Sequence, residues 1–233
     1  STVDSKAGNN TGSQTEDRSS YNQCCNGKIL VVGLGPGNRE QLTPEALVSI
    51  QRADVIVGYK TYLELIEDLL EGKEVISSGM RREKDRAEEA VKQAEAGKTV
   101  AVVSSGDPGV YGMAGILLEI ADENLEVQIV PGVTAATAAA AALGAPLMHD
   151  FAVISLSDLL TPWVTIMNRL EAAGLGDFIV VLYNPKSKGR QKHIEAAREI
   201  LLWHKSPQTP VGIVRCARRG EESVVITTLL DML

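Results

Sequence analysis

Three glycine-rich segments each follow a predicted buried strand and offer backbone N–H groups to a ligand. They read Gly33-Leu34-Gly35-Pro36-Gly37-Asn38, Ser104-Ser105-Gly106-Asp107-Pro108-Gly109-Val110, and Val130-Pro131-Gly132-Val133-Thr134-Ala135. Glycine allows the backbone to approach a ligand closely. Open α/β sheets bind ligands at the carboxyl ends of their strands. The three segments together therefore predict a crevice large enough for a nucleoside.

The first glycine segment differs from the two common nucleotide-binding motifs. Its spacing is Gly-x-Gly-x-Gly, whereas the dinucleotide fingerprint is Gly-x-Gly-x-x-Gly. Pro36 also lacks an N–H group that a pyrophosphate would need. The second predicted strand ends without the acidic residue that binds a ribose, and no Gly-Lys-Ser/Thr follows any glycine loop. These differences disfavour a nicotinamide cofactor and exclude a Walker loop.

A local basic segment stands out against the acidic charge of the whole chain. The net charge is −7, from 30 acidic and 23 basic residues, which argues against a nucleic-acid partner. Lys186, Lys188 and Arg190 precede or begin a predicted helix, and Arg215 ends a later strand. Positive charge at a helix N-terminus opposes the helix dipole. The segment is either a solvated helix start or, as we favour, the binding site of an anionic ligand.

The elements that position these residues alternate between short apolar strands and amphipathic helices. Such alternation over 233 residues is typical of an α/β protein with a largely parallel sheet. We expect a disordered polar tail over residues 1–27, an α/β domain over 28–147 and a second α/β domain over 148–233, with a cleft between the domains. Predicted strands cover residues 29–32, 55–57, 100–104, 127–130, 152–156, 178–183, 211–215 and 224–227. Predicted helices cover residues 44–52, 62–70, 86–96, 110–120, 134–143, 162–173 and 190–203.

Several function classes are disfavoured by composition. No run of 18 apolar residues is present, so no membrane span is expected. The three cysteines form no CxxC pair, which fits the reducing cytoplasm. The three histidines show no metal-binding spacing, and no Ser-His-Asp arrangement can be assembled. We therefore expect a cytoplasmic protein without a metal site or a catalytic triad.

The three glycine segments, in this order and at this spacing, resemble the tetrapyrrole methylase family of S-adenosylmethionine-dependent methyltransferases. The resemblance covers residues 28–233. Within the family, the segments 154–163, 182–185 and 214–221 are similar to the branch that methylates C-17 of precorrin-3B or cobalt-factor III in cobalamin biosynthesis. This resemblance implies a homodimer that couples methylation to contraction of the tetrapyrrole ring. It also implies a further strand after residue 233, without which one sheet edge would be unpaired.

The resemblance further implies roles for individual residues. S-adenosyl-L-methionine, the methyl donor, would lie between the domains, and the positions that match the family's donor-binding set are Pro36, Ser105, Gly106, Asp107, Val110, Thr134, Ala135, Asn184 and Ala217. Since the tetrapyrrole carries many carboxylates, the basic residues Lys186, Lys188, Arg190 and Arg215 would bind it.

Proton movements during ring contraction need an acid or a base. The candidates are Ser155, Asp158 and Thr161, although Thr161 also fits a helix N-cap before Pro162. Two alternatives stay open. One is methylation of a different tetrapyrrole carbon, and the other is a non-catalytic protein that binds a nucleotide or a tetrapyrrole.

Overall fold

The structure is a computed structural model that describes residues 27–79, 82–186 and 192–233. The expected tail therefore lies outside the described residues, apart from Gly27. Lys188 and Arg190 also lie outside them. Among the described helices, none is long and apolar enough to cross a membrane.

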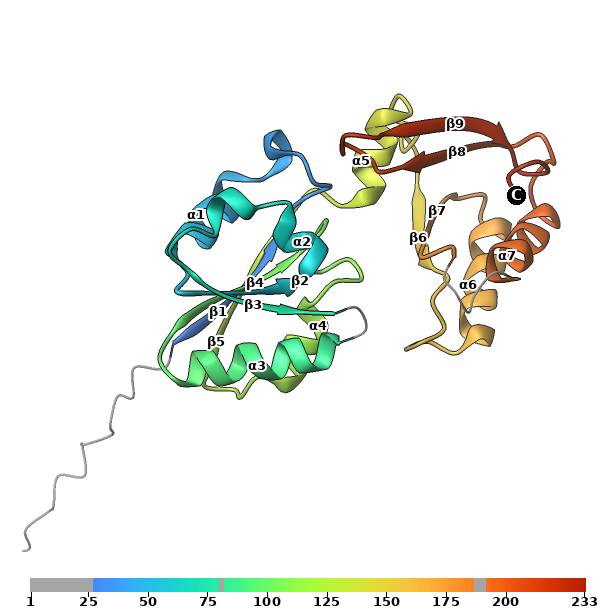
Figure 1. Cartoon of the computed structure of the whole chain (residues 1–233). Coiled ribbons are helices and arrows are strands. Elements are labelled where there is room, and N and C mark those ends of the chain that lie inside the picture. The colour runs from blue at the N-terminus through green and yellow to red at the C-terminus, as the bar shows by residue number, and fades with distance from the viewer. Residues whose placement is uncertain (1–26, 80–81, 187–191) are drawn as a thin grey trace, which may run out of the picture.

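The first part of the chain forms a parallel sheet with helices on both faces (Figure 1). The strand order is β3-β2-β4-β1-β5. The strands are β1 (Lys28–Gly33), β2 (Val55–Tyr59), β3 (Glu74–Ser78), β4 (Thr99–Ser104) and β5 (Glu126–Val130). The helices are α1 (Pro44–Arg52), α2 (Lys60–Glu64), α3 (Glu83–Glu95), α4 (Ala114–Ile120) and α5 (Ala135–Ala142), with short 3-10 helices at Arg39–Gln41 and Glu67–Leu69. The predicted α/β class is confirmed.

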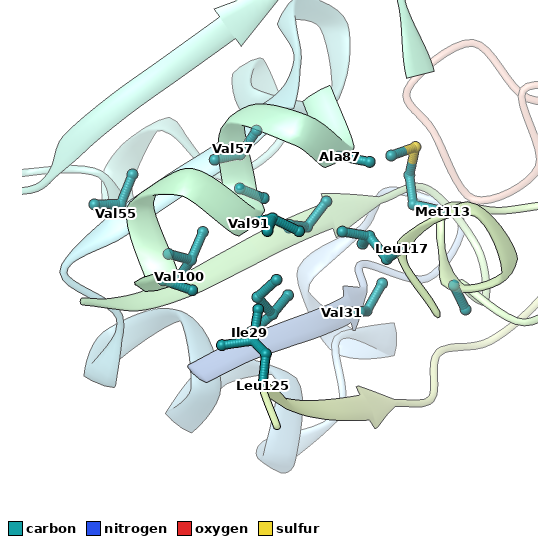
Figure 2. Packing of buried hydrophobic residues seen from close by; sticks show 14 residues of the cluster. Ile29, Val31, Val55, Val57, Ala87, Val91, Val100, Met113, Leu117 and Leu125 are labelled. Carbon is teal, nitrogen blue, oxygen red and sulfur yellow. The ribbon is translucent and has the colours of Figure 1, made fainter. Parts of the chain in front are cut away.

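Two apolar layers hold this sheet between its helices. Ile29, Val31 and Val57 point to the layer that α3 and α4 cover (Figure 2). Leu30, Val32 and other alternate residues point to the opposite layer, under α1 and α2. Because both faces are buried, the central strands read as continuous apolar runs. This packing fixes the carboxyl ends of the strands, where the glycine segments lie.

The start of α1 follows the sequence prediction. Thr43 is the N-cap, and its Oγ1 accepts a hydrogen bond from the N–H of Ala46 at 3.1 Å. Pro44 occupies the first turn, where its missing N–H is not needed.

Three local predictions were wrong. The helix expected from Val110 begins only at Ala114, because Tyr111 has φ +55°, which no α-helix accommodates. The edge strand β3 was not predicted, since Val75 and Ile76 are its only apolar residues. Thr161 is not an N-cap: Pro162 takes that position with ψ 138°, and no side chain caps the helix.

The second part of the chain contains two separate two-stranded sheets. β6 (Phe151–Ser155) and β7 (Ile179–Tyr183) are parallel, while β8 (Pro210–Arg215) and β9 (Ser223–Thr228) form an antiparallel pair. The helices α6 (Trp163–Leu175) and α7 (Lys192–Leu202) pack on each other and on β6. In Figure 1 the β8–β9 hairpin passes close to α5, which belongs to the first part.

Candidate functional site

The three glycine segments meet through backbone contacts at the carboxyl edge of the first sheet. Gly35 and Gly106 form a two-bond bridge, with N–O distances of 2.7 and 3.1 Å. A Cβ atom on Gly33 would lie 2.7 Å from both the Gly106 oxygen and the Gly132 nitrogen. No side chain larger than hydrogen fits between these loops. The sequence therefore predicted the convergence of the segments correctly.

Asp107 fastens two of these loops to each other. Its Oδ2 accepts a hydrogen bond from the N–H of Gly132 at 3.0 Å, and its Oδ1 accepts one from Gly109 at 2.7 Å. Hydrogen bonds to an ionised carboxylate are stronger than neutral ones. Asp107 thus holds the second and third glycine segments in register. The expected contact between Asp107 and the donor stays a prediction.

Tyr183, at the end of β7, connects the second part of the chain to the third glycine segment. Its hydroxyl lies 2.5 Å from the Oγ1 of Thr134 and accepts a hydrogen bond from the N–H of Ala136 at 2.8 Å. Ala136 belongs to the first turn of α5, where N–H groups have no partner within the helix. Tyr183 therefore caps α5. It was not among the predicted site residues, although it precedes Asn184 in a segment that was singled out.

Replacing Tyr183 by phenylalanine is expected to destabilise the protein by about 1–3 kcal/mol, because the N–H of Ala136 loses its acceptor. The phenyl ring keeps its packing against Tyr111, whose ring centroid is 5.3 Å away. Urea unfolding measures the change. Tyr62→Phe is the matched control, since its ring contact with Tyr59 survives the substitution. Equal stability of the two variants would contradict the capping role.

Tyr111 makes a second connection between the two parts of the chain. Its hydroxyl donates to the carbonyl of Val153 at 3.0 Å and accepts from the N–H of Ser155 at 3.1 Å. The Oγ of Ser155 accepts a further hydrogen bond from the Nδ2 of Asn184 at 3.0 Å. Ser155 and Asn184, predicted for different roles, therefore lie side by side at the ends of β6 and β7.

Arg219, in the loop between β8 and β9, reaches the first two glycine segments. Its Nε donates to the carbonyl of Pro36 at 2.5 Å, and its Nη2 donates to the Oγ of Ser105 at 2.7 Å. The guanidinium lies so close to Gly37 that a Cβ there would be 2.7 Å from Nε. Ala217 belongs to the same loop. Hydrogen bonds thus connect this loop and all three glycine segments into one site.

A cavity of about 590 Å³ lies between α5, β7 and β8, and Ala135 is the residue of the glycine segments that lines it. Pockets for small molecules and cofactors have volumes of about 300–1,000 Å³ and mainly apolar walls. The walls here include the apolar side chains of Leu143, Val181 and Val211. Two residues of the predicted donor set, Ala135 and Asn184, also line it. The volume of the cavity therefore falls in the range of small-molecule pockets.

The described members of the predicted basic set lie near this cavity. Lys186 lines it and is exposed to solvent. Arg215 is exposed at the end of β8, whose earlier residues form one wall. Lys188 and Arg190 lie outside the described residues.

The predicted acid–base residues do not form one cluster. Ser155 contacts Asn184, as described above. Asp158 Oδ2 lies 3.7 Å from the Nε2 of His193 on α7, a residue that the sequence did not single out. Thr161 lies in the link that leads to α6, three residues beyond Asp158.

The chain matches the family described as tetrapyrrole (corrin/porphyrin) methylases over residues 28–232. It is 54% identical to "Cobalt-factor III methyltransferase" of Priestia megaterium, over 89% of this chain and 40% of that protein. It is 50% identical to "Probable cobalt-factor III C(17)-methyltransferase" of Salmonella typhimurium, over 88% of this chain and 86% of that protein. The chain thus spans less than half of the first relative and most of the second.

The fold agrees with a solved structure of the same kind. The crystal structure of the methyltransferase CobJ superposes with a TM-score of 0.85 at 40% sequence identity, covering 89% of this chain and 88% of that one. The family match over residues 28–232 includes the three glycine segments and both parts of the chain. The chain belongs to the tetrapyrrole (corrin/porphyrin) methylase family.

Proposed function

We propose that this protein is an S-adenosylmethionine-dependent methyltransferase of cobalamin biosynthesis. Its acceptor is C-17 of cobalt-factor III or precorrin-3B, and methylation is coupled to ring contraction. The observation that carries the proposal is the high identity to relatives that are named for cobalt-factor III methylation, since it extends over most of the chain. The anaerobic substrate, cobalt-factor III, is favoured because both names specify it.

The site fits a nucleoside methyl donor. Glycine at positions 33 and 132 lets the three loop backbones pack closely, which would bring together the loops that carry the proposed donor-binding residues. The adjoining cavity offers apolar walls for an adenosine group. The residues that we propose to hold the donor are Pro36, Ser105, Gly106, Asp107, Val110, Thr134, Ala135, Asn184 and Ala217. To this set the geometry adds Arg219, which contacts Pro36 and Ser105.

The protein's task in this reaction is alignment. The bound donor supplies a methyl group on a positively charged sulfur, which an electron-rich tetrapyrrole carbon attacks in line. Holding two reactants in the reactive geometry contributes about 7–11 kcal/mol. The loops braced by Asp107, Tyr183 and Arg219 would hold the donor, while Lys186, Arg215 and the undescribed Lys188 and Arg190 would bind the tetrapyrrole carboxylates.

Incubation with isotopically labelled S-adenosylmethionine and cobalt-factor III, or precorrin-3B, tests the proposal. We expect a product that is one methyl group heavier by mass spectrometry, with the label at C-17 by NMR. Label on another carbon would favour a different branch of the family. Binding of both ligands without turnover would favour a non-catalytic role. Tight binding of NADH without binding of S-adenosylhomocysteine, measured by calorimetry, would reject the donor altogether.

The homodimer and the cytoplasmic location expected from the sequence are part of the same proposal. Exposed apolar side chains on the β8–β9 hairpin, among them Ile213, Val225 and Ile226, support a contact between subunits. Light scattering coupled to size-exclusion chromatography tests the dimer, for which the mass should be twice that of the chain.

A further inference from the structure

His193 is held in one orientation at the carboxyl edge of the second part's parallel sheet. It is the second residue of α7, and its side chain is only 18% exposed. Its Nδ1 lies 2.9 Å from the carbonyl oxygen of Leu156. Its ring stacks on Trp163 with a centroid distance of 4.1 Å and an angle of 15°. Contacts on the edge and on the face of the ring thus fix the imidazole.

This orientation decides which ring nitrogen can exchange protons. A carbonyl oxygen only accepts hydrogen bonds, so Nδ1 must carry a proton to bond Leu156. Nε2 is then the nitrogen that can take up and release a proton. It faces Asp158, whose Oδ2 is 3.7 Å away and whose side chain is 39% exposed. A histidine oriented by one partner and facing a carboxylate is a common acid–base arrangement.

The His193–Asp158 pair lies next to the site described above. Leu156 directly follows Ser155, whose Oγ is bound by Asn184. The N–H of Leu156 donates to the carbonyl of Tyr183 at 2.9 Å, so Leu156 extends the pairing of β6 with β7. The imidazole is therefore anchored one residue beyond the strand end that carries Ser155.

We propose that His193, together with Asp158, is the proton-transfer pair for the tetrapyrrole step. This inference rests on the proposed function and assigns a catalytic residue to it. When the macrocycle gives up a proton, Nε2 forms the new N–H bond, and the bonding electron pair stays on the macrocycle. The Asp158 carboxylate balances the charge of the imidazolium. Return of the proton to the macrocycle restores the neutral imidazole of His193, so the proton transfer needs no further reactant.

Other charged residues lie near the His193–Asp158 pair. Lys192 precedes His193 on α7, and Glu195 lies in the same first turn; both are exposed. On the facing segment, Asp158 is the group within ion-pair distance of Nε2 among the described residues. A substitution of His193 that keeps the hydrogen bond to Leu156 but cannot transfer a proton tests proton transfer without changing the position of the side chain.

His193→Gln is the variant of choice, because a glutamine amide can still donate to the Leu156 carbonyl but cannot transfer a proton. His204→Gln is the matched control. That histidine is 19% exposed and also faces a carboxylate, with Nε2 2.7 Å from the Oε1 of Glu171, but it lies beyond the opposite end of α7. We expect His193→Gln to lower the rate of product formation about 100-fold. Its affinity for S-adenosylhomocysteine and its melting temperature should match those of the His204 variant.

The pH–rate profile supplies the second measurement. The limb that reports the histidine in the wild-type profile should be absent from His193→Gln and present in His204→Gln. Asp158→Asn should slow the reaction, because it removes the carboxylate that faces Nε2. Wild-type rate in His193→Gln, or a slower rate with an unchanged profile, would overturn the inference. Absence of methyl transfer by the wild-type protein would instead reject the proposed function, so the two failures are distinguishable.

Discussion

Gly132→Ala is expected to abolish binding of S-adenosylhomocysteine to the protein. A Cβ at this position would overlap the backbone oxygen of Gly106 and lie 2.9 Å from two backbone atoms of Gly33. These neighbours are main chain and cannot rotate away as a side chain can. The second and third glycine segments must therefore separate, and the hydrogen bond from the N–H of Gly132 to Asp107 is lost with them. We expect an affinity at least 1,000-fold lower, since about 4 kcal/mol of strain and lost bonding corresponds to that factor.

Isothermal titration calorimetry with S-adenosylhomocysteine measures this affinity, and thermal unfolding reports whether the fold survives. Gly115→Ala is the matched control. Gly115 lies in α4, and a Cβ there meets no atom within 4 Å. Alanine also favours a helix by up to about 1 kcal/mol over glycine, so this variant should bind normally and melt no lower. Normal binding by Gly132→Ala would show that the donor does not depend on these loops.

The sequence predicted the parts of the fold that depend on short-range patterns. The continuous apolar run of residues 29–32 gave β1, and Thr43 before Pro44 gave the start of α1. Both signals are local. Burial of a strand on both faces produces a continuous apolar run, and a helix N-cap is recognised from two or three neighbouring residues. The strand β3 was not predicted, because it lies at the sheet edge and needs few apolar residues to pack.

The candidate site was predicted where it consists of backbone and missed where it consists of distant side chains. The composition of the glycine segments is enough to predict that their backbones approach one another closely, and in the structure they do converge. Tyr183 and Arg219 reach partners 47 and 183 positions away. His193 was overlooked for the same reason, since its partner Leu156 is 37 positions away. No spacing rule connects residues at such separations without the fold.

These long-range contacts give the two parts of the chain different tasks. The first part presents a backbone edge, whose central strands β1, β2 and β4 are buried on both faces. The second part contributes side chains that form hydrogen bonds to that edge. Tyr183 contacts the third glycine segment, and Arg219 contacts the first two. The proposed donor site takes residues from both parts, so it requires the second part to lie against the first. Loss of one fastening side chain should therefore weaken donor binding even though the first sheet stays folded.

Arg219→Ala tests that dependence, and we expect it to lower affinity for S-adenosylhomocysteine about 100-fold. The guanidinium makes two hydrogen bonds to the glycine segments, at 2.5 and 2.7 Å. A hydrogen bond to a charged group contributes about 1.5–3 kcal/mol, and losing two leaves the loop that carries Ala217 without its attachment to Pro36 and Ser105. About 3 kcal/mol corresponds to the expected factor. Lysine keeps the charge but cannot make both bonds, so Arg219→Lys should recover only part of the affinity.

Arg218→Ala controls for the charge removed. Arg218 is the neighbouring residue, it is exposed, and the contact of its backbone N–H with the Oε2 of Glu222 does not depend on its side chain. Calorimetry with S-adenosylhomocysteine should therefore give near wild-type affinity for Arg218→Ala. Because the ligand carries a carboxylate, a general effect of positive charge would weaken both variants equally. If the hydrogen bonds of Arg219 to Pro36 and Ser105 are what matters, Arg219→Ala alone should lose binding. Unchanged or tighter binding by Arg219→Ala would instead show that the guanidinium competes with the donor for Pro36 and Ser105.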